Sequence, residues 1–168
     1  MVKSSIKLTS RLPMVAAIVL LILQIFSPAP VVMFTLVAIA GVLGISYLWA
    51  RQLAGGISLQ RQRRYGWAQV GDIFEERFIL DNDAWVPILW AELLDFSDPP
   101  GYSASRGIGL GARSSTRWTT TGTCERRGIF TLGPTQVITG DPFGIFEVTL
   151  AHNFTETFVV YPSIAALP

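Results

Sequence analysis

The most prominent pattern along the chain is a long apolar stretch near its amino terminus. Residues 12–50 include no charged side chain, and prolines interrupt the middle of the stretch at Pro28 and Pro30. Because a proline inside a helix removes a backbone hydrogen bond and clashes with the preceding turn, the pattern predicts two helices, over residues 12–27 and 31–50. At a rise of about 1.5 Å per residue, the second helix is ~30 Å long, which matches the hydrocarbon core of a bilayer, and the first is ~24 Å long.

The two helices are expected to form an antiparallel transmembrane hairpin, because only a few residues join them. Basic residues flank the hairpin on both sides; they are Lys3, Lys7 and Arg11 before it and Arg51, Arg61, Arg63 and Arg64 after it. Since positive charge favours the cytoplasmic side, both ends are expected there, in a multi-pass protein of the plasma (inner) membrane. A cleaved signal peptide is the alternative, although a second apolar stretch directly follows its candidate cleavage site at residues 27–29.

After residue 50 the pattern changes to short runs of β-branched and aromatic residues, separated by Gly, Pro, Asp and Asn, which is typical of strands joined by turns. The runs predict strands over residues 57–65, 73–81, 86–95, 116–124, 129–132, 135–139, 145–150 and 157–161. In the second run Phe74, Glu76, Phe78 and Leu80 share one face, as alternation along a strand requires. The expected fold is an all-β, immunoglobulin-like sandwich that follows the two-helix transmembrane hairpin.

Charge and cysteine content limit the function classes. The chain divides into a basic cytoplasmic amino terminus, the hairpin and the sandwich, at residues 1–11, 12–50 and 51–168. All 12 acidic residues but only ten of the 13 basic ones lie after residue 50, so the sandwich is slightly acidic and nucleic acid is not an expected partner. The single Cys124 and the single His152 exclude an internal disulfide and a Cys/His zinc module.

A glycine-rich segment is the best candidate for a mobile loop and for a ligand site. It spans residues 98–115, and its glycines and flanking arginines are Arg106, Gly107, Gly109, Gly111 and Arg113. The spacing resembles a phosphate-binding loop, which would make the chain a nucleotide- or anion-binding module or an enzyme fragment. Such a loop needs the amino terminus of a helix after it, whereas a strand is expected there. A flexible hairpin loop is the favoured interpretation.

The remaining candidate chemical groups are isolated. His152 has no serine in a Gly-x-Ser-x-Gly turn to activate, and Cys124 has no histidine beside it in the sequence, so a surface-loop histidine and a small core residue are expected. The stretch Asp95-Phe96-Ser97-Asp98 only partly resembles the start of a von Willebrand A metal site, and a hydrogen-bonded turn is expected there. No catalytic residue, cofactor or metal site is predicted, and the chain is not expected to be an enzyme.

An ordered series of turn motifs fills the carboxy-terminal third of the chain. It consists of Arg126-Arg127-Gly128, Leu132-Gly133-Pro134, Gly140-Asp141-Pro142-Phe143-Gly144 and Val160-Tyr161-Pro162. Together with the two apolar segments and Val70-Gly71-Asp72, this series resembles the amino-terminal part of the domain of unknown function 58 family, membrane proteins of bacteria and archaea. Members of that family continue into a von Willebrand A-like domain, which residues 1–168 do not include.

Most residues of these motifs are expected to shape turns; they are Gly133, Pro134, Gly140, Asp141, Pro142 and Gly144. Asp141 at the first position, Pro142 at the second and Gly144 at the fourth suit a type I turn whose aspartate accepts backbone hydrogen bonds. An exposed contact patch for a partner, around Arg126, Arg127 and Phe143, is the functional alternative.

The resemblance also implies partners. Genes of the family lie near those of MoxR-type AAA ATPases, which are cytoplasmic motors, and of transglutaminase-like membrane proteins. The expected function is therefore a non-catalytic, membrane-anchored sandwich that uses the lipid bilayer to tether or scaffold a partner, within a MoxR-type ATPase system. Two alternatives stay open: the ligand-binding module or enzyme fragment based on residues 107–111, and an extracytoplasmic adhesion-type domain.

Overall fold

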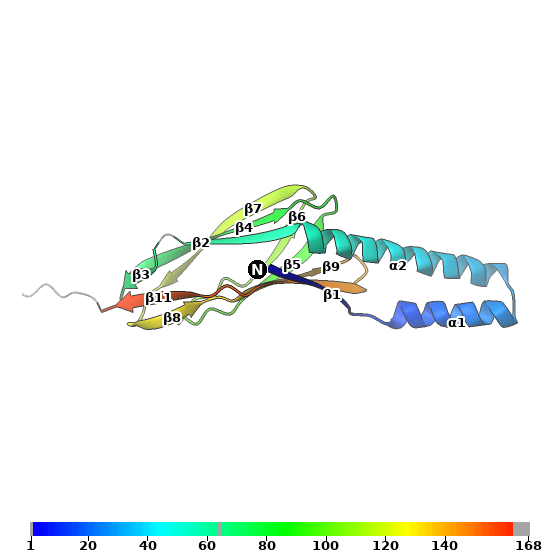
Figure 1. Ribbon diagram of the computed structural model, residues 1–168, viewed down its shortest axis with the longest axis horizontal. Helices are drawn as coiled ribbons and strands as arrows, with labels where there is room; N and C mark the ends of the chain where they lie inside the picture. The colour runs from blue at the N-terminus through cyan, green and yellow to red at the C-terminus, as the bar shows by residue number, and fades with distance from the viewer. Residues whose placement is uncertain (1, 64, 163–168) are drawn as a thin grey trace, which may run out of the picture.

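The computed structural model describes residues 2–63 and 65–162. It is elongated, with a β-sandwich at one end and a two-helix hairpin that projects from it (Figure 1). The prediction of a mostly β, sandwich-like domain preceded by two helices is confirmed at this level. All eight predicted strands are present with ends shifted by at most a few residues, and three further strands were not predicted.

The hairpin consists of α1 (Leu12–Phe26) and α2 (Pro30–Gly56). Both helices have a proline in their first turn, where a missing N–H leaves no hydrogen bond unmade. α2 continues past Ala50, the predicted end, because Ser46, Ala50 and Leu53 recur at helical spacing and are buried against the sandwich. The domain boundary expected after residue 50 therefore falls inside a continuous helix.

The hairpin presents apolar side chains that nothing in the described chain covers. No side chain of α1 is buried, and Leu12, Phe26, Val31 and Phe34 are between 75% and 83% exposed. Within the described residues, α2 is the one helix long and apolar enough to cross a membrane, whereas α1 is shorter, at 15 residues. Soluble monomers rarely expose a continuous apolar surface of this kind.

The amino-terminal segment is a strand of the sandwich, and the prediction of a separate basic tail was incomplete. β1 (Val2–Leu8) pairs antiparallel with β10 (Phe146–His152) at the edge of the largest sheet. The short alternation of Ser5, Ile6, Lys7 and Leu8 was the available signal. Because β1 precedes α1 and β2 (Ile57–Arg63) follows α2, both open ends of the hairpin attach to the same domain.

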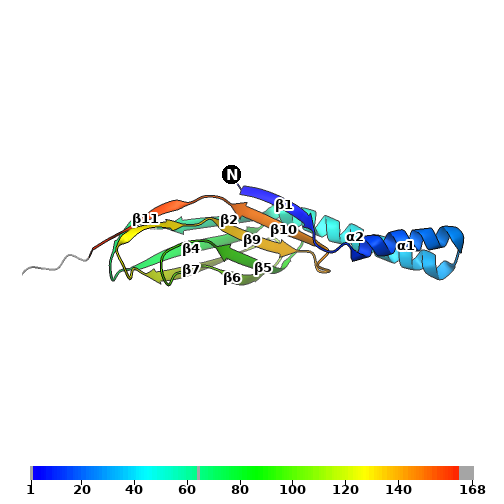
Figure 2. The same cartoon turned by 90° about the horizontal axis from the view of Figure 1, so that it is seen from below.

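Three sheets form the sandwich, with strand orders β1-β10-β9-β5-β6, β2-β4-β7 and β3-β11-β8. The other strands are β3 (Trp67–Gln69), β4 (Ile73–Asn82), β5 (Ile88–Asp95), β6 (Arg106–Leu110), β7 (Ser114–Thr123), β8 (Gly128–Leu132), β9 (Thr135–Gly140) and β11 (Glu156–Tyr161). β8 runs into β9, and β10 runs into β11, with short breaks between them. The first and third sheets thus make one long layer that faces β2-β4-β7 (Figures 1 and 2).

The core lies between these two layers. Phe78 and Leu80 on β4 belong to one cluster with Leu93, Val137 and Phe158 from the other layer, and each of the five is at most 1% exposed. The predicted alternation of β4 is confirmed, because every second side chain of this strand is buried. Glu76 lies on the buried face as well, and a carboxylate in such a position requires partners.

Candidate functional site

A buried arginine lies between the two layers of the sandwich. Arg61 on β2 donates from Nε to Oε1 of Glu76 at 2.9 Å and from Nη2 to Oε2 of the same carboxylate at 2.5 Å. Glu76 lies on the neighbouring strand β4 and is 1% exposed. The pair is bidentate, and this is the geometry in which a guanidinium and a carboxylate interact most strongly.

The same guanidinium also bonds to the opposite layer. Nη1 of Arg61 donates to Oδ1 of Asp95 at 3.0 Å and to Oγ1 of Thr135 at 3.1 Å, and Nη2 donates to Oγ of Ser97 at 3.0 Å. These bonds and the two to Glu76 use all five N–H donors of the side chain. Arg61 therefore ties β2 and β4 to β5 and β9 through a set of satisfied hydrogen bonds.

Tyr102 completes what we call the arginine network, which consists of Arg61, Glu76, Asp95, Ser97, Tyr102 and Thr135. Its phenol O–H donates to Oε2 of Glu76. Burial and this hydrogen bond raise the pKa of Tyr102 well above its ordinary value. Burial acts to lower the pKa of Arg61, but the hydrogen bond and negative charge of Glu76 outweigh it, so that pKa is raised. Both groups keep their protons at physiological pH.

The raised pKa of Tyr102 should make the fold less stable at alkaline pH. An unfolded tyrosine loses its proton near pH 10, whereas folded Tyr102 keeps it. Above about pH 10 the folded state therefore binds more protons than the unfolded state. The free energy of unfolding should then fall by up to ~1.4 kcal/mol per pH unit. Tyr102→Phe should be less stable than the wild type at neutral pH by about 1–3 kcal/mol, and should lose less stability above pH 10. Urea unfolding at several pH values measures both effects. Equal slopes for the two proteins above pH 10 would contradict the assignment.

The arginine network is closed to substrates. The side chains of Asp95, Glu76 and Arg61 are 0%, 1% and 12% exposed. A cavity that touches the network beside His152 and Phe154 has a volume of about 30 Å³, which is room for a single water molecule. The arrangement therefore supports a structural role that joins the two layers, rather than a reaction centre.

The stretch Asp95-Phe96-Ser97-Asp98 is not the expected turn, because it continues from the end of β5 and bonds through its backbone to residues 131–134, and the turn follows at residues 99–102. Oγ of Ser97 donates to Oδ1 of Asp95 at 2.9 Å and accepts the N–H of Gly133 at 2.8 Å. Oδ1 of Asp98 accepts the N–H of Thr131 at 2.6 Å. In residues 2–63 and 65–162, no group of three or more His, Cys, Asp or Glu side chains is arranged to hold a metal ion. These polar side chains instead fix the break between β8 and β9.

Gly133 lies in that break, where only glycine fits. Its φ is +84°, and an added Cβ would lie 2.6 Å from the carbonyl oxygen of Phe154. The Gly133–Pro134 peptide is cis, and the carbonyl of Pro134 accepts the N–H of Phe96 at 3.0 Å. The motif thus positions the strands on either side of the arginine network.

The second glycine-containing motif connects β9 to β10. Asp141 is 1% exposed, and its carboxylate accepts the N–H of Phe143 at 2.9 Å and that of Phe146 at 2.6 Å. The N–H of Gly144 donates to the carbonyl of Asp141 at 3.2 Å. Gly140 is the last residue of β9, and Pro142 lies at the second position of the connection. The connection adjoins the hairpin, because the ring of Phe146 contacts that of Tyr47 on α2 with centroids 5.8 Å apart.

The glycine-rich segment includes a strand, and the prediction of one long loop was wrong. Residues Arg106–Leu110 form β6, which pairs with β5, and Ile108 and Leu110 pack against the core while the glycines face outward. Arg106 lies over the ring of Trp118 at 5.8 Å, whereas Arg113 lies in the turn beyond the other end of β6. Neither described helix begins here. The segment therefore lacks the helix terminus that a phosphate-binding loop requires.

The two isolated reactive groups of the sequence are both partly or fully buried. Cys124 is 4% exposed, and burial raises the pKa of its thiol, as expected for a core residue. His152 is the last residue of β10 rather than part of a surface loop; it is half-buried, and burial lowers its pKa. Its ring lies against that of Phe154, with centroids 6.4 Å apart. Neither residue is placed as a nucleophile or base.

The residues expected to form one partner patch lie at opposite ends of the sandwich. Arg126 and Arg127 are exposed in the β7–β8 connection, at the end away from the hairpin, whereas Phe143 is 57% exposed at the hairpin end (Figure 1). β8 and β9, which run between these ends, span residues 128–140, or roughly 40 Å of extended chain. The expectation of a single patch was therefore wrong.

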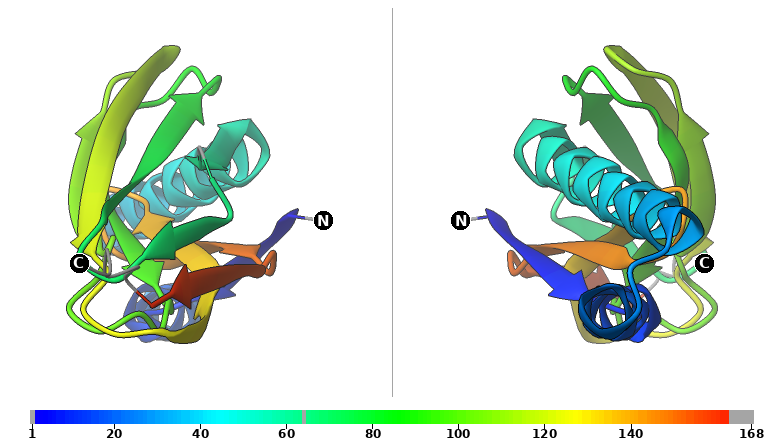
Figure 3. Two further views of the ribbon diagram at one scale, coloured as in Figure 1. Left: turned by 90° about the vertical axis from the view of Figure 1, so that its left-hand side faces the viewer. Right: turned by 90° about the vertical axis from the view of Figure 1, so that its right-hand side faces the viewer.

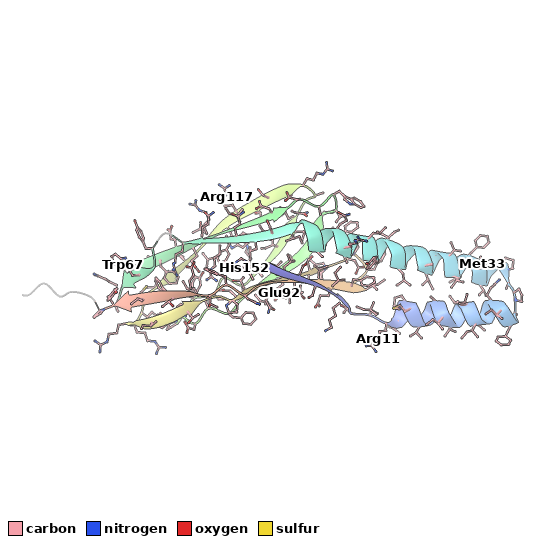
Figure 4. All side chains as sticks on the ribbon, in the orientation of Figure 1. Arg11, Met33, Trp67, Glu92, Arg117 and His152 are labelled. Carbon is pink, nitrogen blue, oxygen red and sulfur yellow. The ribbon has the colours of Figure 1, made fainter. Side chains whose placement is uncertain are left out.

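The end away from the hairpin, called the far end below, carries a groove of about 560 Å³. Its lining includes Trp67 and Ile73, 57% and 68% exposed, together with Asp72 and Glu75. Cys124 bonds through its backbone to that of Asp72, so Arg126 and Arg127 follow within three residues of the edge of the groove. Figure 4 shows Trp67 at this end and Arg11 at the opposite one. The far end thus combines exposed aromatic and charged side chains.

No family model matches the sequence, and no curated protein matches it. Among solved structures, the chain is similar to the CARDB domain of a Pyrococcus furiosus protein in complex with di-metal ions, at 9% identity and a TM-score of 0.45, over 64% of this chain and 94% of that one. It is also similar to the sporulation control protein Spo0M of Bacillus subtilis, at 7% identity and a TM-score of 0.38, over 64% and 50%. A β-glucosidase of Listeria innocua matches at 12% identity and a TM-score of 0.36, over 66% of this chain and 16% of the enzyme. At these identities and scores, none of the three assigns the chain to a family.

Proposed function

We propose that the protein is a non-catalytic, membrane-anchored β-sandwich that holds a partner at the cytoplasmic face of the membrane. The hairpin is the observation that carries this proposal. Its two helices project from one end of the sandwich, their large apolar side chains are exposed on α1 and on the outer part of α2, and residues 12–50 carry no charge. A lipid bilayer is an apolar environment that covers a two-helix hairpin on all sides while its backbone hydrogen bonds stay internal.

The orientation follows from the attachment of both open ends to one domain. β1 and β2 flank the hairpin and belong to the same sandwich, so both of its open ends lie on one side of the membrane. Arg11 and Arg51 mark these two ends, and the turn between the helices carries no charge. The excess of positive charge favours the cytoplasmic side, in the plasma (inner) membrane.

The far end is the surface we propose for the partner. It faces away from the hairpin and carries Arg126 and Arg127 beside the groove that contains Trp67. The resemblance to the domain of unknown function 58 family suggests a MoxR-type AAA ATPase as that partner, in a system that includes a transglutaminase-like membrane protein. Anchoring would act by raising the local concentration of a weakly bound partner, with no chemical step of its own.

Charge reversal at the far end tests this function. The double variant Arg126→Glu/Arg127→Glu should reduce copurification of the ATPase with the tagged full chain from solubilised membranes by about tenfold, which corresponds to ~1.4 kcal/mol. Membrane association should not change. Arg117→Glu is the matched control, because Arg117 is exposed on β7 outside the far end. Unchanged copurification in the double variant would exclude the far end, and failure of the wild type to retain the ATPase would exclude this partner.

A further inference from the structure

The hairpin joins the sandwich without a flexible linker at either of its open ends. The N–H groups of Thr9 and Ser10 donate to the carbonyl of Ile145 at 2.8 and 3.3 Å, so the chain is fixed up to the residue before Arg11. On the other side, α2 runs into the sandwich as one helix, and its first buried side chain is Ser46. No flexible stalk separates the sandwich from the projecting part of the hairpin in this described region, so the two move together.

The projecting part is shorter than a bilayer core. α1 has 15 residues, or about 22 Å, and the free part of α2, residues 30–45, is about 24 Å long. The hydrocarbon core of a typical bilayer is about 30 Å thick. Any gap between the sandwich and the headgroups would shorten the inserted part further and expose apolar side chains to water. The length of the hairpin therefore draws the adjoining end of the sandwich onto the membrane surface.

The exposed side chains at this level include four that we call the rim: Arg11, Tyr47, Arg51 and Phe143. Tyr47 is 45% exposed on α2 and contacts Phe146, the first residue of β10, three positions after Phe143. Arg51 follows Tyr47 by about one helical turn. Figure 3 (right) looks along the hairpin at this end of the sandwich. Aromatic rings and arginines are the side chains that favour the boundary between hydrocarbon and water, where arginine reaches lipid phosphates.

The charge of the rim also fits a headgroup layer. Arg11 adjoins the amino terminus of α1, where the helix dipole disfavours positive charge, and α1 has no acidic residue in its first turn. Asp141, in the same connection as Phe143, is buried and occupied by backbone N–H groups. Exposed or half-buried acids near this end include Asp81, Asp83 and Glu147, and Lys7 lies opposite Glu147 in the register of β1 and β10. Anionic headgroups would compensate the charge of the two rim arginines.

We propose that the rim is a binding surface for anionic lipid headgroups, which seats the sandwich directly on the bilayer. Tyr47 and Phe143 lie among the headgroups, and Arg11 and Arg51 bind lipid phosphates. This inference rests on the proposed membrane anchor and adds the lipid class and the residues that contact it. The rigid junction then holds the far end at a fixed height, roughly 40 Å of extended strand from the rim.

A pair of matched nitroxide labels tests the proposal in the full chain. Phe143→Cys and Trp67→Cys replace aromatic residues that are both 57% exposed, one at each end of the sandwich. The native Cys124 is buried with a raised pKa, so the labelled wild type serves as the blank. In nanodiscs of phosphatidylcholine with about one third phosphatidylglycerol, the label at residue 143 should meet a water-soluble nickel chelate several-fold less often than the label at residue 67. It should meet molecular oxygen, which concentrates in lipid, at least as often.

The outcomes separate the rim from the anchor. Equal contact with the nickel chelate at residues 143 and 67 would overturn the rim, and so would shielding of residue 143 from both reagents, because that indicates a protein neighbour. A third label, at Val37→Cys on α2, reports the anchor itself. If the chelate reaches the label at residue 143 but not the label at residue 37, the membrane anchor is supported and the rim is excluded. If the chelate reaches the label at residue 37, the proposed function fails as well. Omitting phosphatidylglycerol should increase the contact of residue 143 with the chelate only in part, because the short hairpin still draws the rim to the membrane surface, and no change would overturn the choice of anionic headgroups.

Discussion

Two lysines placed halfway along the hairpin should release the protein from the membrane. Val19 on α1 and Val37 on the free part of α2 are 49% and 58% exposed, so neither substitution disturbs a packed core. A lysine at the centre of a membrane helix makes insertion less favourable by about 2.5–3.5 kcal/mol, and the Val19→Lys/Val37→Lys variant carries about twice that penalty. We expect the variant in the soluble fraction after an alkaline carbonate wash, or degraded, whereas the wild type stays with the membranes.

The same substitution on the sandwich is the matched control. Ile129 lies on β8 at the far end and is 76% exposed, so Ile129→Lys introduces the same charge at a site that we place in water. It should leave the protein in the membrane fraction. If the hairpin were instead exposed to water, all three lysines would be ordinary surface substitutions, with effects within about 0.5 kcal/mol. Retention of the double variant in the membrane fraction would therefore contradict the anchor.

A sandwich held directly on the bilayer, as we propose, differs in function from a sandwich on a flexible tether. The chain is hydrogen-bonded through Ser10 on one side of the hairpin and helical through Gly56 on the other, so the far end has a defined height and direction. A rigid anchor restricts the positions that Arg126 and Arg127 can sample, and the effective concentration of a bound partner is greatest when its own site lies at the matching height. In the proposed arrangement, the junction would contribute to partner choice as well as to attachment.

Local pattern was sufficient for most of the fold. The eight predicted strands were found because β-branched and aromatic runs alternate with turn residues, and the two helices because Pro28 interrupts an apolar stretch. The three missed strands have weaker or conflicting signals. β3 has three residues, the lysines of β1 resemble the flank of a membrane segment, and Gly107 and Gly109 gave β6 the composition of a loop. In each case pairing with a neighbouring strand outweighs local propensity.

The arginine network was not predicted, because its members are distant in the sequence. Glu76, Asp95 and Thr135 lie 15, 34 and 74 positions from Arg61, and the arginine was interpreted only as positive charge behind the hairpin. One signal was present: Glu76 shares a face with Phe74 and Phe78, and a carboxylate on a buried face needs a cationic or hydrogen-bonding partner. Which residue supplies that partner depends on how the layers stack, and strand alternation alone does not specify it.

Replacing the central arginine should destabilise the sandwich strongly. Arg61→Met keeps much of the side-chain volume but leaves the carboxylates of Glu76 and Asp95 buried without their cation. Removal of one partner from a buried ion pair typically lowers the free energy of unfolding by about 3–5 kcal/mol, and we expect a loss of this size for Arg61→Met. Chemical unfolding of the full chain, followed by tryptophan fluorescence in detergent, measures the change. Arg117→Met is the control, because Arg117 is exposed, and it should change stability by less than about 0.5 kcal/mol.

Two further measurements show whether Arg61→Met is destabilised by the loss of the positive charge or by the loss of side-chain packing. In Arg61→Met the uncompensated carboxylates should have raised pKa values, because burial without a cation disfavours the charged form. The folded variant then binds more protons than the unfolded chain as pH falls. The difference in the free energy of unfolding between the wild type and the variant should therefore become smaller from neutral to mildly acidic pH. Adding Glu76→Gln should restore part of the stability, since the amide removes one buried charge and its oxygen still accepts the O–H of Tyr102. A deficit that is independent of pH and unaffected by Glu76→Gln would mean that Arg61 acts through packing alone, and that the two layers are joined without its charge.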